Sequence, residues 1–361
     1  MNSSDIRTIR LHNQQLAKPT MTSPGEIVKW LGAVQAQDYA AAKWSVSLRL
    51  QNVTDKNIEE AFNKGEILRT HVMRPTWHFV LPEDILWMLE LTAPRVRMSL
   101  SHYDRKLELT DQFLSRCFDV ILKSLRGGNF LTRLQLSEQL AKNNISATGQ
   151  RLGHIMAHAE LSGLICSGPR IGKQFTYANL TERAPNAKQL SREESLKTLA
   201  TRYFTSHGPA QVKDFAWWSG LSMKDAQEAR MRVAALTSRD VNGKTYWFIS
   251  EGKEKKAVDN RAFFMSLYDE YTIAYKDRVD ISEERYVEKF ITMGNALTGV
   301  MLFDGNVIGT WKRELSKDSV ALTLSPLRTF TSDEQGGFAQ MAERYKTFLG
   351  KSSVSITYVK T

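Results

Sequence analysis

The sequence contains few cysteines and no long apolar run. Cys117 and Cys166 are the only cysteines among 361 residues, which excludes a disulfide framework and a cysteine-rich zinc site and fits a reducing compartment. No apolar run approaches the about 20 residues needed to cross a bilayer, and the opening stretch MNSSDIRTIRLHNQQL lacks the apolar centre of a secretion signal. We therefore expect no membrane partner and a cytoplasmic location.

Common catalytic and cofactor motifs are also missing. There is no serine elbow, Rossmann fingerprint or kinase signature. The stretch GPRIGKQ resembles a phosphate-binding loop, but it has three residues between its glycines rather than four, and Gln174 stands where Ser or Thr would hold magnesium. His154 and His158 are spaced as helical metal ligands could be, yet the sequence nearby shows no acidic ligand. We expect neither a metal ion nor another cofactor.

The composition is that of a stable globular protein with a basic surface. Hydrophobic residues make up 42% of the chain, and its length suggests two or three units of ordinary domain size. The formal net charge is +10, and the excess is greatest at 101–200, with 14 Lys and Arg against 9 Asp and Glu. This charge fits an acidic partner such as nucleic acid, although solubility alone would also explain it.

The order of predicted elements indicates a mainly α fold with β structure (α+β). Segments 1–100, 101–190 and 191–260 each show a helix, a short turn, a second helix and a pair of strands, which is the winged-helix pattern. From residue 261 to 361 the periodicity shortens to that of strands, so we expect a β-barrel-like C-terminal domain. The charged stretch EGKEKKAVDN, just before it, is the most linker-like part of the chain.

The third segment shows this pattern most clearly. In GPAQVKDFAWWSGLSMKDAQEARMRV, Gly220 is expected to end one helix before another begins. Two strands, 233–238 and 245–249, flank an Asn-Gly hairpin signal. Trp217, Trp218 and Met223 have the spacing of buried helix faces, so we expect them to pack inside the segment.

Two glutamines stand two positions apart in WLGAVQAQDYAAAKWS. Ser23-Pro24 begins an upstream helix, and Asp38 before an alanine run is typical of the N-cap of the next. The junction between these helices therefore falls near residues 36–38. Gln35 and Gln37 can then project together from a bent connection, where they either satisfy the local backbone or take part in chemistry.

The stretch LRTHVMRPTWHFV, residues 68–80, is a second candidate. If it is a strand, Arg74, Thr76 and His78 share one face, although Pro75 interrupts the ladder. An edge strand with a solvated face explains the same pattern.

Five stretches in this order resemble the winged-helix DNA glycosylase family of the AlkZ and YcaQ type. They are AVQAQD, LRTHVMRPTWHFVLPED, HGPAQVKDFAWWSGL, YDEYTIAYKDR and DGNVIGTWKR. The resemblance implies tandem winged-helix units with a C-terminal β-barrel, excision of N7-alkylated purines and unhooking of interstrand crosslinks. It also implies a catalytic Gln-x-Gln or Gln-x-Asp motif. Gln35-Ala36-Gln37 matches the first form, and Asp38 falls one position late for the second.

Glutamine suits this chemistry. An amide is a poor general base near neutral pH, but a purine alkylated at N7 already carries positive charge and leaves readily. The enzyme then mainly has to place a water molecule and stabilise a cationic sugar, and two amide oxygens can do both.

We therefore expect a monofunctional DNA glycosylase that is monomeric, cytoplasmic and nucleoid-associated, with Gln35 and Gln37 as its catalytic residues. Its partner would be double-stranded DNA with alkylated purines. The residues expected to contact DNA are Arg69, Arg74, Thr76, His78, Arg151, Arg170, Lys173, Lys312 and Arg313. A winged-helix transcription regulator and a non-catalytic DNA-binding protein are the alternatives.

Overall fold

The computed structural model describes residues 1–249, 261–283, 285–286 and 299–359. The chain forms two compact units. Unit 1 consists of Met1–Glu59, Lys197–Trp218 and Met223–Thr361, and unit 2 of Glu60–Leu196 and Ser219–Ser222. The predicted linker lies outside the described residues, and the division into four domains stays a prediction.

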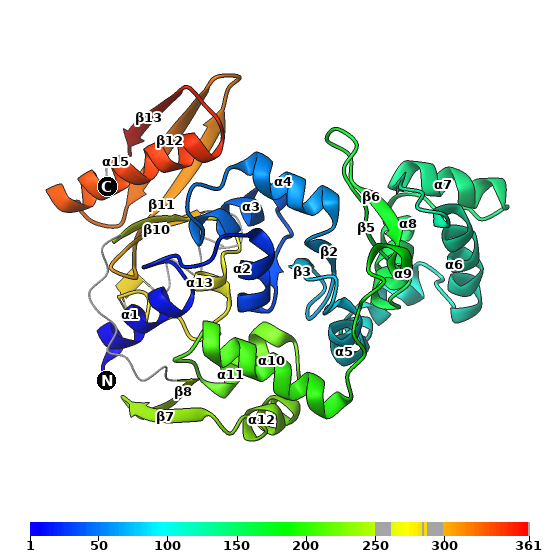
Figure 1. Cartoon of the computed structure of the whole chain (residues 1–361), viewed down its shortest axis with the longest axis horizontal. Coiled ribbons are helices and arrows are strands. Elements are labelled where there is room, and N and C mark those ends of the chain that lie inside the picture. The colour runs from blue at the N-terminus through cyan, green and yellow to red at the C-terminus, as the bar shows by residue number, and fades with distance from the viewer. Residues whose placement is uncertain (250–260, 284, 287–298, 360–361) are drawn as a thin grey trace. The chain divides into compact units, whose positions relative to one another are not determined.

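Unit 1 begins with helices and continues with a helical segment that ends in a two-stranded ribbon (Figure 1). The first elements are α1 (Ser3–Asn13), α2 (Pro24–Leu31), β1 (Val34–Gln35), α3 (Tyr39–Leu48) and the start of α4 (Asp55–Lys64). The later segment holds most of α10 (Arg192–Ser206), then α11 (Val212–Ser219), α12 (Met223–Met231), β7 (Leu236–Val241) and β8 (Lys244–Ile249).

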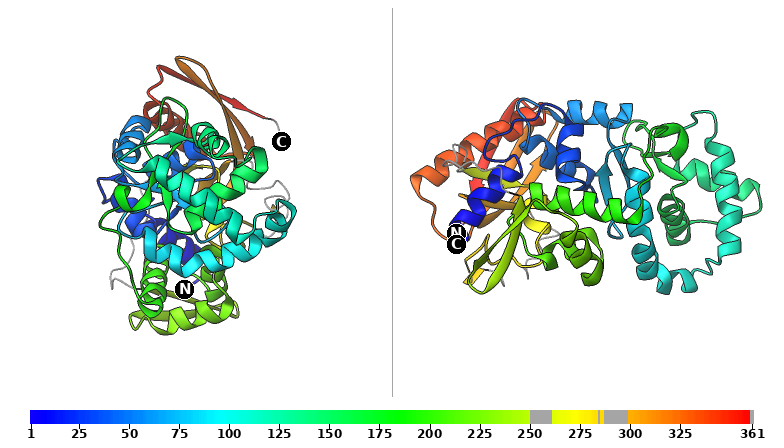
Figure 2. Two further views of the ribbon diagram at one scale, coloured as in Figure 1. Left: turned by 90° about the vertical axis from the view of Figure 1, so that its right-hand side faces the viewer. Right: turned by 60° about the horizontal axis from the view of Figure 1, so that its bottom comes forward.

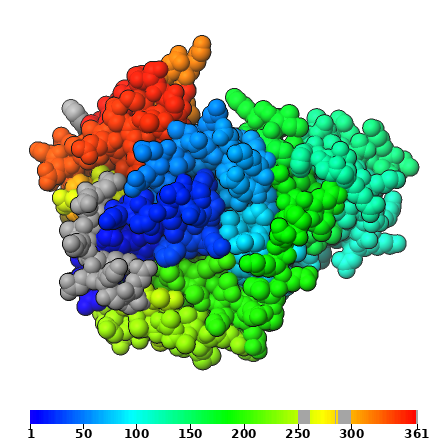
Figure 3. Space-filling view, in the orientation of Figure 1, coloured from blue at the N-terminus to red at the C-terminus, as the bar shows by residue number. Residues whose placement is uncertain are grey.

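These two segments of unit 1 are distant in sequence but share one interior. The buried Arg10 donates from Nε to the Pro209 carbonyl at 2.9 Å, and Asn13 Nδ2 donates to the Gly208 carbonyl at 2.7 Å. In the space-filling view the N-terminal helices (blue) and the later segment (green to yellow-green) form a continuous surface (Figure 3). The interior between them is therefore closed by polar bonds as well as by apolar packing.

The predicted local signals of unit 1 are largely confirmed. Ser23 caps α2 in a capping box, with Pro24 in the first turn, and the Asp38 side chain caps α3. Asn242 and Gly243 form the β7–β8 turn with φ values of 49° and 73°, as an Asn-Gly hairpin requires. The first of these strands begins at Leu236 rather than at 233.

One packing prediction in this segment is mostly wrong. Trp218 is buried, but Trp217 and Met223 are each 46% exposed. Helical spacing identified the correct elements without identifying which of the adjacent indoles faces inward.

The C-terminal part of unit 1 is a five-stranded sheet of order β13-β12-β11-β10-β9. Its later strands are the orange and red arrows of Figure 2. Its strands are β9 (Ala262–Met265), β10 (Gly299–Phe303), β11 (Asn306–Leu315), β12 (Ser319–Pro326) and β13 (Ser353–Tyr358). Neighbours are antiparallel except β12 and β13, which are parallel. The helix α15 (Ser332–Phe348) packs against β9, β12 and β13.

The β-barrel expected here is not found among the described residues, in which the sheet is open, with β9 and β13 at its two edges. The intervening α15 was not predicted, and it covers the sheet with residues such as Phe338 and Tyr345. The stretch after Met265 is also not a strand. Asp269 caps a short helix there, α13 (Glu270–Ile273), and this local cap overrides the β-like composition.

Unit 2 is a mixed α/β structure. Its first elements are the rest of α4, β2 (Leu68–His71), β3 (Trp77–Val80) and the long α5 (Ile85–Lys106). Then come α6 (Asp111–Leu125), β4 (Leu131–Thr132), α7 (Arg133–Lys142), α8 (Gly149–Leu161), β5 (Ile165–Ser167), β6 (Thr176–Asn179), α9 (Leu180–Arg183) and the start of α10. The strands β4, β6 and β5 form a small sheet in that order.

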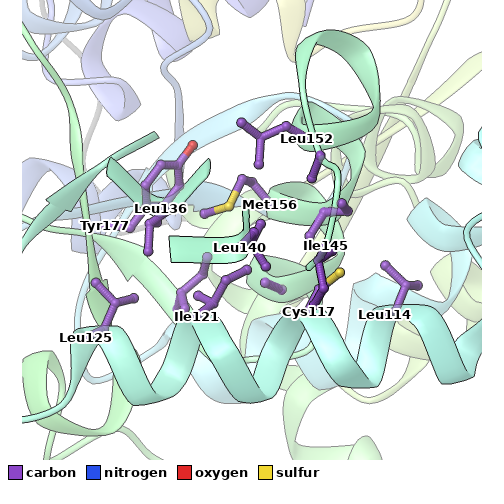
Figure 4. Packing of buried hydrophobic residues seen from close by; sticks show 14 of the residues in the cluster. Leu114, Cys117, Ile121, Leu125, Leu136, Leu140, Ile145, Leu152, Met156 and Tyr177 are labelled. Atoms are coloured by element: carbon purple, nitrogen blue, oxygen red, sulfur yellow. The ribbon is translucent and has the colours of Figure 1, made fainter. Parts of the chain in front are cut away.

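An aliphatic core holds α6, α7 and α8 together. Figure 4 shows Leu114, Cys117, Ile121 and Leu125 along one side of α6, facing residues of α7, α8 and β6. We call this cluster the aliphatic core. Its buried members are Leu109, Leu114, Cys117, Ile121, Leu125, Leu136, Leu140, Ile145, Ala147, Leu152, Ile155, Met156, Ala159, Ile165 and Tyr177.

Within the described ranges, no helix has both the length and the apolar character needed to span a membrane.

Candidate active site

The glutamine pair lies at the junction between α2 and α3. Gln35 is 6% exposed and ends the two-residue strand β1, whereas Gln37 is exposed and precedes the cap of α3. Gly32 makes the turn out of α2 with φ +86°, and a Cβ there would come within 3.3 Å of the Trp218 ring. The junction is therefore closely packed on one side and open to solvent on the other.

The backbone of Gln35 is bound by a buried carboxylate. Its N–H donates to Glu270 Oε1 at 2.9 Å, and the other oxygen of Glu270 accepts the indole N–H of Trp218 at 2.7 Å. Glu270 is 0% exposed. Sequence reasoning missed this residue, although it lies in the stretch YDEYTIAYKDR, where a charged pair among apolar residues is the available signal.

The neighbouring carboxylate, Asp269, makes an ion pair with Arg49 of the α3 C-cap. Arg49 donates to both oxygens of Asp269, at 2.9 and 2.8 Å, and Ser45 adds a bond of 2.6 Å. Burial acts to raise the pKa of Asp269, but the charge and hydrogen bonds of Arg49 outweigh it and hold the pKa below its ordinary value. Asp269 therefore anchors α3 from within the protein.

His207 lies on the far side of Glu270. Its Nε2 is 3.5 Å from Glu270 Oε2, its Nδ1 is 2.8 Å from Ser206 Oγ, and its ring stacks on Tyr203 with centroids 4.9 Å apart. Burial lowers the pKa of His207 despite the opposing effect of Glu270, so the imidazole is neutral at pH 7. We call this set the buried polar network. Its members are Gln14, Ser45, Arg49, Ser206, His207, Trp218, Asp269, Glu270 and Tyr275.

A pocket of about 280 Å³ lies next to the glutamine motif, because Asp38, the residue after Gln37, is part of its lining. Its lining combines indole rings with charged groups: Asp38, Ala41, Trp44, Ser266, Leu267, Gly299, Trp311, Lys312 and Arg313. Asp38 is engaged as the cap of α3, since its Oδ1 accepts the Ala41 N–H at 2.8 Å. Burial lowers the pKa of Arg313, and the nearby charge of Asp38 opposes that shift. Two of the predicted DNA-contacting residues therefore line this pocket.

Arg74, Thr76 and His78 do not lie on one face of a strand, as was predicted, because only His78 belongs to a strand. β2 ends at His71, and Met73, with φ 65°, turns the chain back before β3. The three residues nevertheless meet, because Arg74 Nη2 is 3.4 Å from His78 Nε2, and His78 Nδ1 is 3.0 Å from the Thr76 carbonyl.

His78 is 0% exposed, which contradicts its prediction as a DNA-facing residue. Burial and the charge of Arg74 lower its pKa well below the ordinary value. It is therefore a neutral structural histidine that supports the turn carrying Arg74.

Arg69 was also predicted to contact DNA, and the structure favours a structural role instead. It is 9% exposed, and its guanidinium lies 4.3 Å from the ring centroid of Trp77 and 4.7 Å from that of Phe175. These cation–π contacts hold Arg69 of β2 against the rings of Trp77 in β3 and of Phe175 just before β6.

The other predicted cations of unit 2 lie closer to solvent. Arg170 and Lys173 belong to the wing between β5 and β6, where Ile171 and Gln174 bridge the turn. Lys173 is exposed at the tip, and Arg170 is partly buried and bonds the Lys173 carbonyl at 2.7 Å. Arg151, in the first turn of α8, lies over the ring of Phe113 at 4.3 Å. The stretch GPRIGKQ is therefore a turn between β5 and β6.

The histidine pair does have an acidic neighbour. Asp104 Oδ1 is 3.2 Å from His154 Nδ1 and 3.0 Å from His158 Nε2, across α5 and α8. Nothing in the sequence near the histidines indicates this contact, because Asp104 lies 50 residues before His154. In the parts of the chain that the structure describes, no group of three or more His, Cys, Asp or Glu side chains has the geometry to hold a metal ion.

Comparisons with known proteins bear on the same residues. A model of the AlkZ-like DNA glycosylase family matches residues 28–348. The interstrand DNA cross-link repair glycosylase of Streptomyces sahachiroi is 24% identical over 321 residues, covering 84% of this chain and 85% of that protein. The solved structure of Streptomyces sahachiroi DNA glycosylase AlkZ matches with a TM-score of 0.81 at 20% identity, covering 99% of this chain and all of that one. The mixed α/β fold is therefore shared with that structure.

Proposed function

Because the chain belongs to the AlkZ-like DNA glycosylase family, we propose that its substrate is double-stranded DNA carrying cationic N7-alkylated purines, and that Gln35 and Gln37 carry the hydrolysis. One observation supports this assignment above the others. At the junction between α2 and α3, the exposed Gln37 side chain follows a Gln35 whose backbone is bound by a buried carboxylate. The exposed amide of Gln37 is accessible to a DNA substrate.

The two amides would act by position and dipole. Their oxygens accept hydrogen bonds from the attacking water and present negative dipole ends to the sugar as it becomes cationic. Because neither amide can protonate a leaving base, the mechanism requires a base that already carries positive charge. This requirement is our reason for proposing N7-alkylated purines rather than neutral lesions.

The position of Asp38 supports the Gln-x-Gln form of the motif. Its carboxylate caps α3 and accepts the Ala41 N–H, a task that fixes the start of the helix. A carboxylate used in this way is poorly placed to act as a second catalytic group. Gln37 is therefore the better partner for Gln35.

We extend the proposal to interstrand crosslinks, because the Streptomyces relative is named a cross-link repair glycosylase. The protein would act in DNA repair as a monomer in the cytoplasm, associated with the nucleoid. The three helix-and-hairpin segments would be winged-helix units. The cations proposed to contact phosphate are Arg74, Arg151, Arg170, Lys173, Lys312 and Arg313.

The deciding experiment measures release of free base from a duplex containing N7-methylguanine, in single turnover at saturating enzyme. Loss of one preorganised polar group typically costs about 100-fold in rate, so Gln35→Ala and Gln37→Ala should each slow excision on that order with little change in DNA affinity. The double variant should lose less than the product of the two effects, because both amides act on the same water and cation. Gln37→Asp recreates the Gln-x-Asp form and should keep appreciable activity.

The controls separate the remaining possibilities. Wild-type rates in both alanine variants would remove the catalytic assignment. A wild-type protein without activity on N7-methylguanine or on a crosslinked duplex would favour the regulator or the non-catalytic DNA-binding protein. A crosslinked duplex run in parallel with the single adduct shows which lesion is preferred.

A further inference from the structure

Two consecutive carboxylates of unit 1 are fully buried and have different partners. Asp269 and Glu270 are both 0% exposed. Asp269 faces the guanidinium of Arg49, a partner of opposite charge. Glu270 instead receives an amide N–H and an indole N–H, with an imidazole at 3.5 Å. The pairing of Asp269 is that of a structural ion pair, whereas the pairing of Glu270 points to the glutamine motif.

A carboxylate in this position is costly to bury. Its charge is stable away from water only when hydrogen bonds replace the lost hydration. Each oxygen of Glu270 accepts one short bond, and one of the two comes from the backbone of Gln35. The bond is directional, so it fixes the orientation of the peptide that leads into the motif.

We propose that Glu270 is a positioning residue for the glycosylase reaction, which holds the backbone N–H of Gln35 and thereby orients the amides of Gln35 and Gln37. The inference rests on the function proposed above. Glu270 touches no substrate in this scheme and acts only through the motif.

The geometry of the junction explains why such a tether is needed. β1 is only two residues long, and the side chain of Gln37 lies at the surface, so the motif has little regular structure of its own. If the tether is lost, the buried Gln35 N–H lacks its acceptor and the peptide turns to find another. A displacement of about 1 Å at a reacting group can cost on the order of 100-fold in rate.

Glu270→Gln is the sharpest variant. The amide keeps the shape but has one oxygen, so it can accept the Gln35 N–H or the Trp218 indole N–H but not both. Its NH₂ group then faces the other of these two N–H donors, and two donors cannot form a hydrogen bond. We expect the single-turnover excision rate to fall about 10- to 100-fold, with the dissociation constant for the same duplex changed less than about 2-fold.

Glu160→Gln is the matched control. It makes the same change from carboxylate to amide, on a buried glutamate of unit 2 that likewise accepts a backbone N–H, from His71 at 2.8 Å. It should lower the melting temperature while retaining the wild-type rate per folded molecule. Equal losses of rate in the two variants, or a wild-type rate in Glu270→Gln, would overturn the proposal.

A measurement on the wild-type protein covers the case in which Glu270→Gln does not fold. Hydrogen exchange resolved at single amides should show the Gln35 N–H strongly protected, and exchange at the rate of a free amide would overturn the proposal. This measurement needs no activity. Absence of excision by the wild type would therefore count against the proposed function, while the exchange of the Gln35 amide still tests the tether.

Discussion

The aliphatic core inside unit 2 and the buried polar network inside unit 1 are stabilised by different physics. The aliphatic core of unit 2 is built from Leu, Ile, Ala and Met side chains with one cysteine and one tyrosine. The buried polar network of unit 1 contains a guanidinium, two carboxylates and an imidazole, all fully buried and bonded at fixed distances. The aliphatic core depends on apolar area, and the buried polar network depends on geometry.

This difference matters for function. Hydrophobic burial is non-directional, so side chains in an aliphatic core can shift slightly at small cost. A hydrogen-bonded charge tolerates little movement, because a partner left unsatisfied loses its compensation for burial. The polar network lies under the glutamine junction, where precise orientation is needed. The aliphatic core supports α8, whose Arg151 is predicted to contact DNA.

The largest difference in the free energy of unfolding is expected between a variant of the buried polar network and a variant of the aliphatic core. Asp269→Asn leaves the buried charge of Arg49 uncompensated and should lower the free energy of unfolding by about 3–5 kcal/mol. Ile121→Val removes one methylene from the aliphatic core and should cost about 0.5–1.5 kcal/mol. Urea unfolding of both variants checks the contrast. The prediction is wrong if Asp269→Asn destabilises the protein less than Ile121→Val does.

Two glycine-to-alanine substitutions should change the free energy of unfolding in opposite directions. Gly32→Ala forces an L-residue into a positive φ and brings its Cβ within 3.3 Å of the Trp218 ring, so we expect a loss of about 1–2 kcal/mol. Gly153→Ala, inside α8, meets open space and should stabilise the protein by about 0.5–1 kcal/mol. Thermal melts of the two variants test this prediction. If both variants melt at a lower temperature than the wild type, α8 is more constrained than its contacts indicate.

A third contrast concerns pH. Burial lowers the pKa of His207 below its ordinary value of 6.5, so the unfolded chain takes up a proton at a higher pH than the folded protein. Stability is therefore full above pH 6.5 and is lost as the pH falls below it, by about 1.4 kcal/mol for each unit of pKa difference.

His207→Gln should make the melting temperature depend less steeply on pH between about 7 and 5, which scanning calorimetry can follow. His78 contributes in the same direction from unit 2, because its pKa is also lowered. A matched His78→Gln variant therefore measures the second contribution. An unchanged slope in both variants would show that other groups control the acid sensitivity.

The smallest effect on stability is expected at the wing of unit 2. Lys173 is exposed at the tip, so Lys173→Ala should leave the free energy of unfolding within about 0.5 kcal/mol of wild type. If it contacts a phosphate, the slope of log affinity against log salt for undamaged duplex should fall by about 0.9. Fluorescence anisotropy at several salt concentrations measures the slope. A near-zero slope for the wild type would remove DNA as a partner.

The sequence predicted the features that local signals encode. Ser23, Pro24 and Asp38 act within one turn of their helices, so the starts of α2 and α3 followed from the sequence alone. The end of α2 did not, because this helix stops at Leu31, before the predicted junction at 36–38. The Asn-Gly turn of β7–β8 and the wing turn of unit 2 are equally local. These signals placed the two glutamines correctly between helices.

Other features depend on contacts that no local pattern contains. Glu270 binds a backbone group 235 residues away, and His207 reaches Glu270 from another segment. The turn at Met73 was missed because its positive φ is set by the surrounding structure in a residue that rarely adopts it. The helix α15 was missed because the strands around it dominated the interpretation of the C-terminal segment.

The burial of both cysteines has a practical consequence for labelling. Cys117 lies in the aliphatic core and Cys166 in β5, and burial raises the pKa of their thiols to about 11 and about 12. Because the thiolate is the reactive form, both should resist maleimides at neutral pH in the native protein. A cysteine introduced by Lys173→Cys would then take up a fluorophore selectively. Single-molecule energy transfer could follow the wing of unit 2 on DNA without first removing either native thiol.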